Sequence, residues 1–124
     1  MNTTPKHGDI VIVNLCSHSG TSIQEGVRPA VVVQNDTLNA YSPTTLIAPL
    51  TSVLKKTEMP SHIVLGKRFN LRKNSMVLTE QIRTINQTAI KKTIGHIDDP
   101  KVLARIDQAL ISTLGISTFK EVST

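Results

Sequence analysis

Arg28 is the residue of this sequence best suited to bind an anion. It follows the flexible Gly26 by two positions and directly precedes Pro29, in the run Gly26-Val27-Arg28-Pro29. Proline keeps the residue before it out of helical geometry, and proline itself favours the first position of a strand. We therefore expect the guanidinium to be held rigidly at the mouth of a sheet, where its fork of donors can clamp a phosphate or a carboxylate.

Two further polar groups occur in or beside apolar segments. Thr51 follows the apolar run 44–50, so its hydroxyl is expected at a strand end, where ordinary hydrogen bonding is the alternative to a role in a site. Residues 75–85 combine an apolar frame with unusual polar content. For Glu80 in this run we expect an ion pair within the protein. Alternation along a strand would place Thr79, Gln81 and Arg83 on one face, and Leu78, Glu80 and Ile82 on the other.

Several classes of chemistry find no support in this sequence. No glycine-rich phosphate loop is present, and the cysteine and histidine residues do not have the spacing of a zinc site. Carboxylates are dispersed, and the adjacent pair Asp98-Asp99 is better explained as the start of a helix. A two-metal nuclease site is therefore disfavoured, and we expect neither a metal ion nor another cofactor.

Positive charge is concentrated in the middle of the chain. The 124 residues carry a formal charge of +5, and residues 55–92 hold nine lysines and arginines against two glutamates. The segments on either side each carry a net charge of −1. This distribution favours an anionic partner, with nucleic acid first, and a solvated basic surface is the alternative. With one tyrosine, two phenylalanines and no tryptophan, a base-stacking platform is not expected.

Length and composition predict a single domain over residues 1–124. Hydrophobic residues make up 39% of the chain, and no apolar run approaches the roughly 20 residues of a membrane span. The first residues lack an apolar signal core. The single Cys16 cannot form an internal disulfide, which suits a reducing compartment. We therefore expect a cytoplasmic protein without membrane contact.

Apolar and β-branched runs predict a mainly β architecture. Pro49 lacks a backbone donor and marks an edge or a bulge of its strand. The run 30–34 is apolar almost throughout, so both of its faces should be buried. A polar turn region is expected at 35–43. Strands are expected at residues 10–15, 30–34, 44–50, 61–65, 75–85 and 90–97.

The C-terminal part of the chain changes to a helical period. Asp98 or Asp99 can cap the start of this helix, and Pro100 suits its first turn. Gly115 suits its end. We expect an α+β fold, mainly β, in which a small curved sheet or partly closed barrel packs against this helix. The apolar residues that recur at three- and four-residue spacings are Val102, Leu103, Ile106, Leu110 and Leu114.

Short motifs in a fixed order carry a resemblance to a known family. Together they cover nearly the whole chain. The chain resembles the MazF/PemK-type toxins, the mRNA interferases of bacterial type II toxin–antitoxin systems, and is nearest the MazF-like members of Gram-positive bacteria. The motifs are Gly8-Asp9-Ile10, Gly26-Val27-Arg28-Pro29, Gln34-Asn35-Asp36, Ser42-Pro43-Thr44, Leu50-Thr51, Pro60-Ser61-His62, the run from Glu80 to Ile85, and the tail from Ile106 to Gly115.

The resemblance implies a fold, an activity and an assembly. It implies a small SH3-like β-barrel with a C-terminal helix, shared by the MazF/PemK and CcdB-like toxins, and a tight homodimer. It implies an endoribonuclease that cleaves single-stranded mRNA at a short sequence motif without a metal ion, leaving a 2′,3′-cyclic phosphate and a 5′-hydroxyl. Its inhibitor would be an antitoxin whose acidic, disordered C-terminal tail wraps the basic groove.

The resemblance also implies site residues, position by position. Arg28 and Thr51 stand where such toxins keep a catalytic arginine and threonine. Arg28 is expected to stabilise charge that grows on the phosphoryl oxygens and to take part in proton transfer. The hydroxyl of Thr51 is expected to hydrogen-bond the 2′-hydroxyl or a non-bridging oxygen. The residues expected to contact RNA are Ser22, Gln24, Asn35, Ser75 and Gln81.

The chain departs from the family pattern in its first loop. Residues Cys16 to Thr21 look one residue longer than in relatives, and His18 has no clear counterpart there. His18 is a candidate acid or base near the scissile phosphate, with an exposed loop histidine as the alternative. Two other functions stay open on the same fold: a CcdB-like toxin that binds DNA gyrase, and a non-catalytic binding module. The presence of both Arg28 and Thr51 favours the nuclease.

Overall fold

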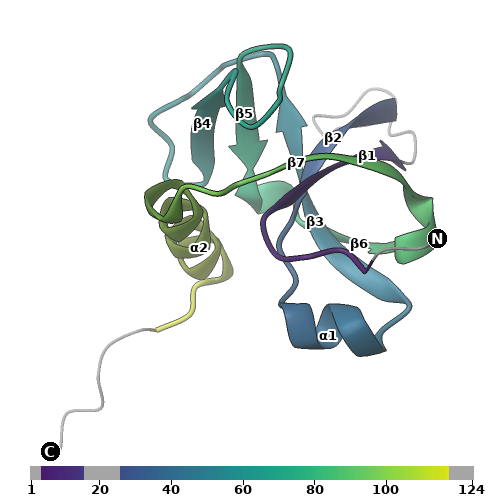
Figure 1. Cartoon of the computed structure of the whole chain (residues 1–124). Coiled ribbons are helices and arrows are strands. Elements are labelled where there is room, and N and C mark those ends of the chain that lie inside the picture. Colours follow the sequence, from purple (N-terminus) through teal and green to yellow (C-terminus); the bar gives the residue numbers. More distant parts are fainter. Residues whose placement is uncertain (1–3, 16–25, 118–124) are drawn as a thin grey trace, which may run out of the picture.

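The computed structural model describes residues 4–15 and 26–117. They form a strongly bent antiparallel sheet of seven strands, flanked by two α-helices (Figure 1). Neighbouring strands follow the order β4-β5-β3-β2-β1-β7, and β6 pairs with β3. The strands are β1 (Asp9–Leu15), β2 (Gly26–Val32), β3 (Thr44–Thr51), β4 (His62–Gly66), β5 (Ser75–Leu78), β6 (Arg83–Asn86) and β7 (Ile90–His96). The helices are α1 (Asp36–Tyr41) and α2 (Pro100–Leu114), with short 3₁₀ turns η1 (Thr79–Gln81) and η2 (Gln87–Ala89).

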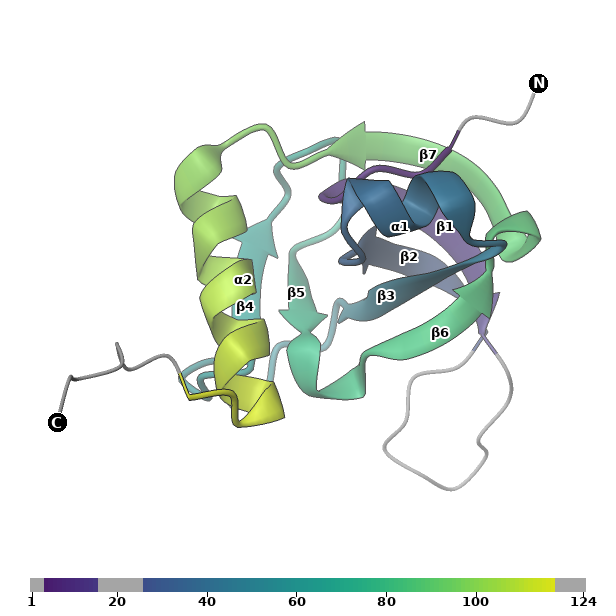
Figure 2. The same ribbon diagram turned by 90° about the horizontal axis from the view of Figure 1, so that it is seen from below.

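Five of the strands curl into a partly closed barrel. Figure 2 shows β7, β1, β2, β3 and β6 arranged in a ring, with α1 lying across one end of it. Beyond Pro49 of β3, the sheet continues into β5 and β4, and α2 packs beside β4 and η1. The expected mainly β fold with a C-terminal helix is confirmed. No helix within the described ranges has the length and apolar character needed to cross a membrane.

The strand β3 changes its neighbour part-way along its length. On one edge, its residues 47–49 pair with β2. On the other edge, residues 44–47 pair with β6, whereas Leu50 and Thr51 pair with β5. Pro49 lies in the gap between these last two ladders, where a missing N–H removes no ladder bond from that edge. Pro49 was expected to mark an edge or a bulge. Its register with β2 is regular, so there is no bulge, and only the edge that faces β5 and β6 is locally unpaired at this position.

The prediction of a single long strand at residues 75–85 is wrong, because the structure divides this segment into β5, η1 and β6. Both strands pair with the same edge of β3 at different levels, so the chain makes a step between them. Thr79 occupies this step and is fully buried. Its N–H and its hydroxyl donate to the carbonyl oxygen of Ser61 at 3.0 and 2.8 Å. The expected alternation of faces from Thr79 to Arg83 therefore does not hold.

The polar region expected as a turn at residues 35–43 contains a short helix, α1. The helix begins after Asn35, whose side-chain oxygen accepts the N–H of Leu38 at 2.8 Å. Asparagine favours both turns and helix N-caps, so the same residue type is compatible with either structure. The helix ends at Ser42, directly before Pro43.

The helix α2 begins and ends as the sequence predicts. Asp99 is its N-cap, with a side-chain oxygen 2.9 Å from the N–H of Lys101. Pro100 occupies the first turn, and Gly115 ends the helix in the left-handed conformation with φ 69°. The residues buried on its apolar face are Val102, Ile106 and Ala109. Leu103 and Leu110 pack against the core partly buried, whereas Leu114, the last residue of the expected apolar face, is exposed.

Residues 30–32 of β2 are buried on both faces, as their apolar sequence predicts. Val31 packs in the core cluster that includes Ile106 of α2. Val32, the next residue, packs in a second cluster with Val13 of β1. Both valines have no exposed surface. The strand begins at Gly26, four residues earlier than expected, whereas the other predicted strands apart from 75–85 start and end within one residue of their predicted positions.

A basic loop of residues 67–74, which joins β4 to β5, lies against β7. Phe69 and Asn70 adopt positive φ angles of 58° and 69°. The side-chain amide of Asn70 donates to the carbonyl oxygen of Ile94 at 2.8 Å. A Cβ atom at Gly95 would overlap the carbonyl oxygen of Phe69. Glycine at this position therefore lets the loop contact the strand closely.

We predict that Gly95→Ala displaces the loop 67–74 and lowers the free energy of unfolding by about 1–3 kcal/mol, the usual cost of an overpacked site. Urea unfolding at neutral pH measures the change. Lys91→Ala, at an exposed position of the same strand, is the control and should change this free energy by less than about 0.5 kcal/mol. Equal stability of the two variants would contradict the prediction.

Candidate active site

A groove opens between β2 and β3 where their ladder ends. The last pair of this ladder is Ala30 with Pro49. Beyond that pair, β2 continues beside β1, whereas β3 passes to β5. The two strands therefore separate, and the space between them is a groove of about 670 Å³. Arg28 of β2 and Thr51 of β3 both line it.

Cationic and polar side chains from four parts of the fold line this groove. Four of them are arginine or lysine, and none of the described lining residues is aspartate, glutamate or histidine. A concave surface with charge of one sign concentrates ions of the opposite sign, so the groove suits a polyanion. The polar lining residues are Arg28, Thr51, Ser52, Asn70, Arg72, Lys73, Ser75 and Lys92.

Arg28 is the third residue of β2 and is half-buried. The expectation that Pro29 begins the strand is wrong, because β2 starts at Gly26 and Pro29 pairs with Ile12 of β1. Alternate residues of a strand direct their N–H groups to the same edge. Since the N–H of Val33 donates toward β3, the nitrogen of Pro29 faces the edge that β3 has left. Proline is tolerated there because no ladder bond is lost.

Thr51 is the last residue of β3 and is 7% exposed. Its side-chain oxygen Oγ1 accepts the backbone N–H of Val53 at 3.1 Å. This bond orients the hydroxyl group and occupies one of its lone pairs. The hydroxyl proton can then be donated to an acceptor in the groove.

Ser75, at the start of β5, supports the backbone of the basic loop. It is 4% exposed, and its hydroxyl donates to the carbonyl oxygen of Lys73 at 2.8 Å. The bond holds the end of the loop that carries Arg72 and Lys73. Ser75 thus lines the groove as expected, and its hydroxyl proton is already engaged within the protein.

The structure does not bring every expected contact residue into the groove. Asn35 caps α1, at the opposite end of β2 from Arg28 (Figure 1). Gln81 lies in η1, and neither residue lines the groove. His18, Ser22 and Gln24 lie outside the described residues, so their places in the site stay predictions.

Three basic residues of the groove were not predicted individually from the sequence. Arg72 and Lys73 belong to the basic loop, and Lys92 belongs to β7. They lie within segment 55–92, and the positive charge of this segment is the sequence feature that pointed to them. Charge density alone does not separate them from Arg68, which is bound elsewhere in the protein. Within the described ranges, no group of three or more histidine, cysteine, aspartate or glutamate side chains is placed to hold a metal ion.

Comparison with known proteins identifies the family. The family of PemK-like, MazF-like toxins of type II toxin–antitoxin systems matches residues 6–114. The chain belongs to this family. Endoribonuclease MazF of Staphylococcus epidermidis is 36% identical over 115 residues, which make up 92% of this chain and 94% of that protein. The assignment of this toxin to the endoribonuclease class, made from the sequence motifs, is confirmed.

Solved structures share the fold of this toxin. MazF from Deinococcus radiodurans matches with a TM-score of 0.77 at 24% identity, over 93% of this chain and 100% of that chain. A MazE–MazF structure from the same organism gives a TM-score of 0.74 at 25% identity, over 94% and 100%. A mycobacterial endoribonuclease in complex with its cognate antitoxin gives 0.73 at 20% identity, over 91% and 97%. The curved, barrel-like fold expected for MazF/PemK toxins is confirmed.

Arg68 of this toxin anchors the basic loop to the start of α2. Its guanidinium lies 2.7 Å from Oδ2 of Asp99 and stacks 4.7 Å from the centre of the Phe69 ring. Arg68 lowers the pKa of the Asp99 carboxyl below its ordinary value, and the N–H of Lys101 adds to the effect. Asp99 therefore caps the helix and holds the loop at the same time.

We predict that this ion pair makes the toxin less stable at acid pH. Because the pKa of Asp99 is lower in the folded chain, the carboxylate stabilises the fold above its ordinary pKa. That contribution disappears as the pH falls through the lowered pKa. Asp99→Asn keeps a good N-cap and removes the charge, so its stability should fall less between about pH 5 and about pH 2. Urea unfolding across this range measures the difference.

The exposed neighbour Asp98 supplies the control for this measurement. Asp98→Asn removes a carboxylate of the same type one position away and should show the acid dependence of the wild type. If Asp99→Asn and Asp98→Asn give the same curve, the pair between Arg68 and Asp99 does not contribute to stability.

Proposed function

We propose that this toxin cleaves single-stranded mRNA at a short sequence motif without a metal ion. The 2′-oxygen of one nucleotide attacks the adjacent phosphorus, a 2′-O–P bond forms, and the bond from phosphorus to the 5′-oxygen breaks. The 2′-hydroxyl loses a proton and the 5′-oxygen gains one. The products are a 2′,3′-cyclic phosphate and a 5′-hydroxyl. Since the RNA supplies its own nucleophile, the reaction requires no metal-bound water.

One observation carries this proposal: Arg28 and Thr51 lie in the same cationic groove. They come from strands that separate at this level, and the basic loop and Lys92 add three positive side chains to the lining. A phosphodiester backbone fits such a lining, because each nucleotide brings one negative charge. The aromatic content is low, which favours recognition through phosphates and hydrogen bonds rather than through extensive stacking.

Arg28 is proposed to stabilise the phosphoryl group during attack. Its planar guanidinium can donate to both non-bridging oxygens, where negative charge grows in the transition state. Its half-buried position on a strand keeps the donors in a fixed orientation. We also propose that Arg28 takes part in proton transfer, because the described lining holds no histidine or carboxylate for that role.

Thr51 is proposed to act as a hydrogen-bond donor. Its oxygen already accepts the N–H of Val53, and an alcohol stays protonated at neutral pH. The hydroxyl proton is therefore available to a non-bridging oxygen or to the attacking 2′-oxygen. In this position it would align the nucleophile with the leaving 5′-oxygen, which is the main requirement of the reaction.

Other residues are proposed to contact the RNA away from the scissile phosphate. Ser75 lines the groove and has an oxygen that can still accept a bond. Asn35 and Gln81 lie outside this groove, so any contact from them would be to nucleotides farther along the strand. For residues outside the described ranges, Ser22 and Gln24 stay proposed contacts and His18 a proposed acid or base.

We propose that the toxin is a cytoplasmic homodimer inhibited by an antitoxin. Two of the similar structures are complexes with an antitoxin or with MazE. An acidic, disordered C-terminal tail would suit the cationic groove and would fold on binding. Such a tail would compete directly with RNA for Arg28 and its neighbours. The cytoplasm is where mRNA is translated, which is why we place the toxin there.

We predict that Arg28→Ala lowers the rate of RNA cleavage by on the order of 100- to 1,000-fold, the usual loss when one donor to a developing oxyanion is removed. Arg28→Lys keeps the charge without the planar fork and should recover only part of the rate. The assay incubates a long single-stranded RNA in excess chelator and maps the 5′ ends of the fragments. Intact RNA together with inhibition of DNA gyrase would overturn the proposed function.

We predict that Lys92 contacts an RNA phosphate. For single-stranded RNA, each lost contact reduces the slope of log affinity against log salt concentration by about 0.7. The slope is measured with an uncleavable RNA that carries a 2′-deoxy nucleotide at the scissile position. Lys92→Ala should reduce the slope by this amount.

Lys91→Ala is the matched control for the salt experiment. Lys91 does not line the groove, and it is the extra residue at the point where the register between β1 and β7 shifts. Its removal takes away the same charge from the neighbouring position of β7 and should leave the slope close to that of the wild type. Equal slopes for the two variants would place the RNA elsewhere on the surface.

A further inference from the structure

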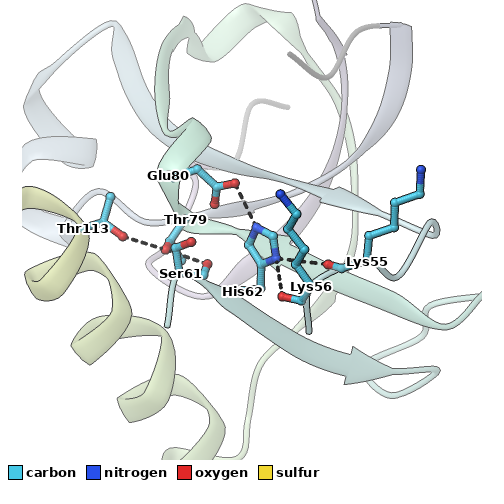
Figure 3. Close-up of polar contacts among 7 residues, drawn as sticks. All are labelled: Lys55, Lys56, Ser61, His62, Thr79, Glu80 and Thr113. Atoms are coloured by element: carbon cyan, nitrogen blue, oxygen red, sulfur yellow. Dashed lines mark hydrogen bonds and ion pairs between the residues drawn. The ribbon is translucent and has the colours of Figure 1, made fainter. Parts of the chain in front are cut away.

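The side chain of His62 joins two segments of the chain, η1 and the loop between β3 and β4. It is the first residue of β4, and its side chain is 8% exposed. Its Nε2 atom lies 2.9 Å from Oε2 of Glu80 in η1. Its Nδ1 atom lies 3.0 Å from the carbonyl oxygen of Lys56 and 3.3 Å from that of Lys55. Figure 3 shows the ring between the carboxylate on one side and the two carbonyl groups on the other.

Every hydrogen-bond partner of this ring is an acceptor. Carboxylate and carbonyl oxygens accept only, so the ring fits when both nitrogens carry protons and donate them. A ring engaged in this way has no nitrogen left to exchange a proton with a substrate. His62 therefore suits a connecting role rather than acid–base catalysis, and the expected ion pair of Glu80 is confirmed.

The lysine carbonyls belong to the loop between β3 and β4. Residues 52–60 of this loop are all exposed, so the core contributes little to its conformation. Lys56 adopts φ 53°, a left-handed conformation that is unfavourable for a residue with a side chain. The carbonyl oxygen of Lys56 also accepts the N–H of Met59 at 3.0 Å. Two hydrogen bonds on one oxygen thus stabilise a turn that the sequence alone would not favour.

The same loop begins at Thr51. The N–H of Val53, two residues into the loop, donates to the hydroxyl oxygen of Thr51. The path of the loop therefore sets the direction of the Thr51 hydroxyl. A chain of hydrogen bonds runs from Glu80 through His62 to the Lys56 carbonyl, and only Leu54 and Lys55 separate Lys56 from Val53 in the sequence.

We infer that His62 is a positioning residue for RNA cleavage: by holding the Lys55 and Lys56 carbonyls, it keeps the hydroxyl of Thr51 aligned in the groove. This inference rests on the proposed function. Displacement of a reacting group by about 1 Å typically costs on the order of 100-fold in rate. Release of the loop should therefore lower kcat and leave KM nearly unchanged, because the cationic residues that bind RNA are elsewhere.

Two pairs of variants separate the loop contact from other effects. In the first pair, the side-chain amide of His62→Asn replaces Nδ1 and keeps the bond to the loop, whereas that of His62→Gln replaces Nε2 and keeps only the bond to Glu80. In the second pair, Lys56→Gly allows a positive φ and Lys56→Pro forbids it. Both substitutions at position 56 remove the same ammonium group. They also leave His62 and Glu80 intact, so they report on the loop even where a change at His62 impairs folding.

The expected result is a fall in kcat of about 10- to 100-fold for His62→Gln and Lys56→Pro, with KM within about 3-fold of the wild type. His62→Asn and Lys56→Gly should stay within about 3-fold in kcat. Thr51→Val, which removes the hydroxyl, sets the largest loss that misalignment can cause. Hydrogen exchange of the Val53 N–H gives a readout independent of RNA. It should become faster in the two impaired variants only.

Different failures of this experiment have different meanings. If the wild-type toxin leaves RNA intact, the proposed function fails, and exchange at Val53 still decides whether His62 holds the loop. If the wild type cleaves and His62→Gln and Lys56→Pro cleave equally fast, the inference is wrong. An equal loss in His62→Asn and His62→Gln would also overturn it, because the contact with the loop would then not be the one that matters.

Discussion

The structure depends on how one strand, β3, divides its pairing: one edge pairs with β2 only as far as Pro49, and the other edge pairs first with β6 and then with β5. It leaves β2 after Pro49 and joins β5 at Leu50. The separation of β2 from β3 produces the groove, and Arg28 of β2 and Thr51 of β3 both line it. Pro29 and Pro49 lie where ladders of the sheet end. Neither has an N–H that would be left unpaired, so the fold tolerates the loss of ladder bonds at both positions. The site is therefore a consequence of how the sheet bends.

The cationic wall of the groove is held by contacts that carry no charge. Gly95 lets the loop 67–74 approach β7, Asn70 bonds the carbonyl of Ile94, and Ser75 bonds the carbonyl of Lys73. Like charges gathered on one concave surface repel each other, and a bound polyanion relieves that repulsion. Backbone contacts fix the wall without neutralising it. The exception is Arg68, whose pairing with Asp99 fastens the loop to α2 and takes one charge away from the groove.

Histidine–carboxylate pairs join distant parts of the chain at several places. His7 contacts Asp107 of α2 at 3.0 Å, and His96 contacts Asp9 at 2.8 Å. His62 and Glu80 form a third pair in the described part of the chain. Each pair connects the end of a strand or the chain before it to another element. Such pairs suit a small β-barrel, in which many short elements must be held in register by few side chains.

Sequence alone determined the features that arise from local physics. The period of α2, its Asp99 cap and its terminal Gly115 depend on neighbouring residues, and the structure confirms them. The burial of Val31 and Val32 on both faces follows from an apolar run. The sequence singles out Arg28 and Thr51 as candidates because their local sequence, a pre-proline arginine and a strand-end threonine, is distinctive and matches a family motif in order and spacing.

Only the tertiary structure decided which of these residues meet. The run 75–85 reads as one strand, but it must pair with two levels of β3, and Thr79 turns the chain between them. Lys92 is one of nine bases in the middle of the sequence, and its place in the groove depends on β7 lying beside β1. Likewise, the bond from His62 to the Lys56 carbonyl depends on a turn with unfavourable φ. The physical reason is the same in each case: hydrogen bonds and charges act between atoms brought together by folding, and local sequence preference carries no information about those long-range neighbours.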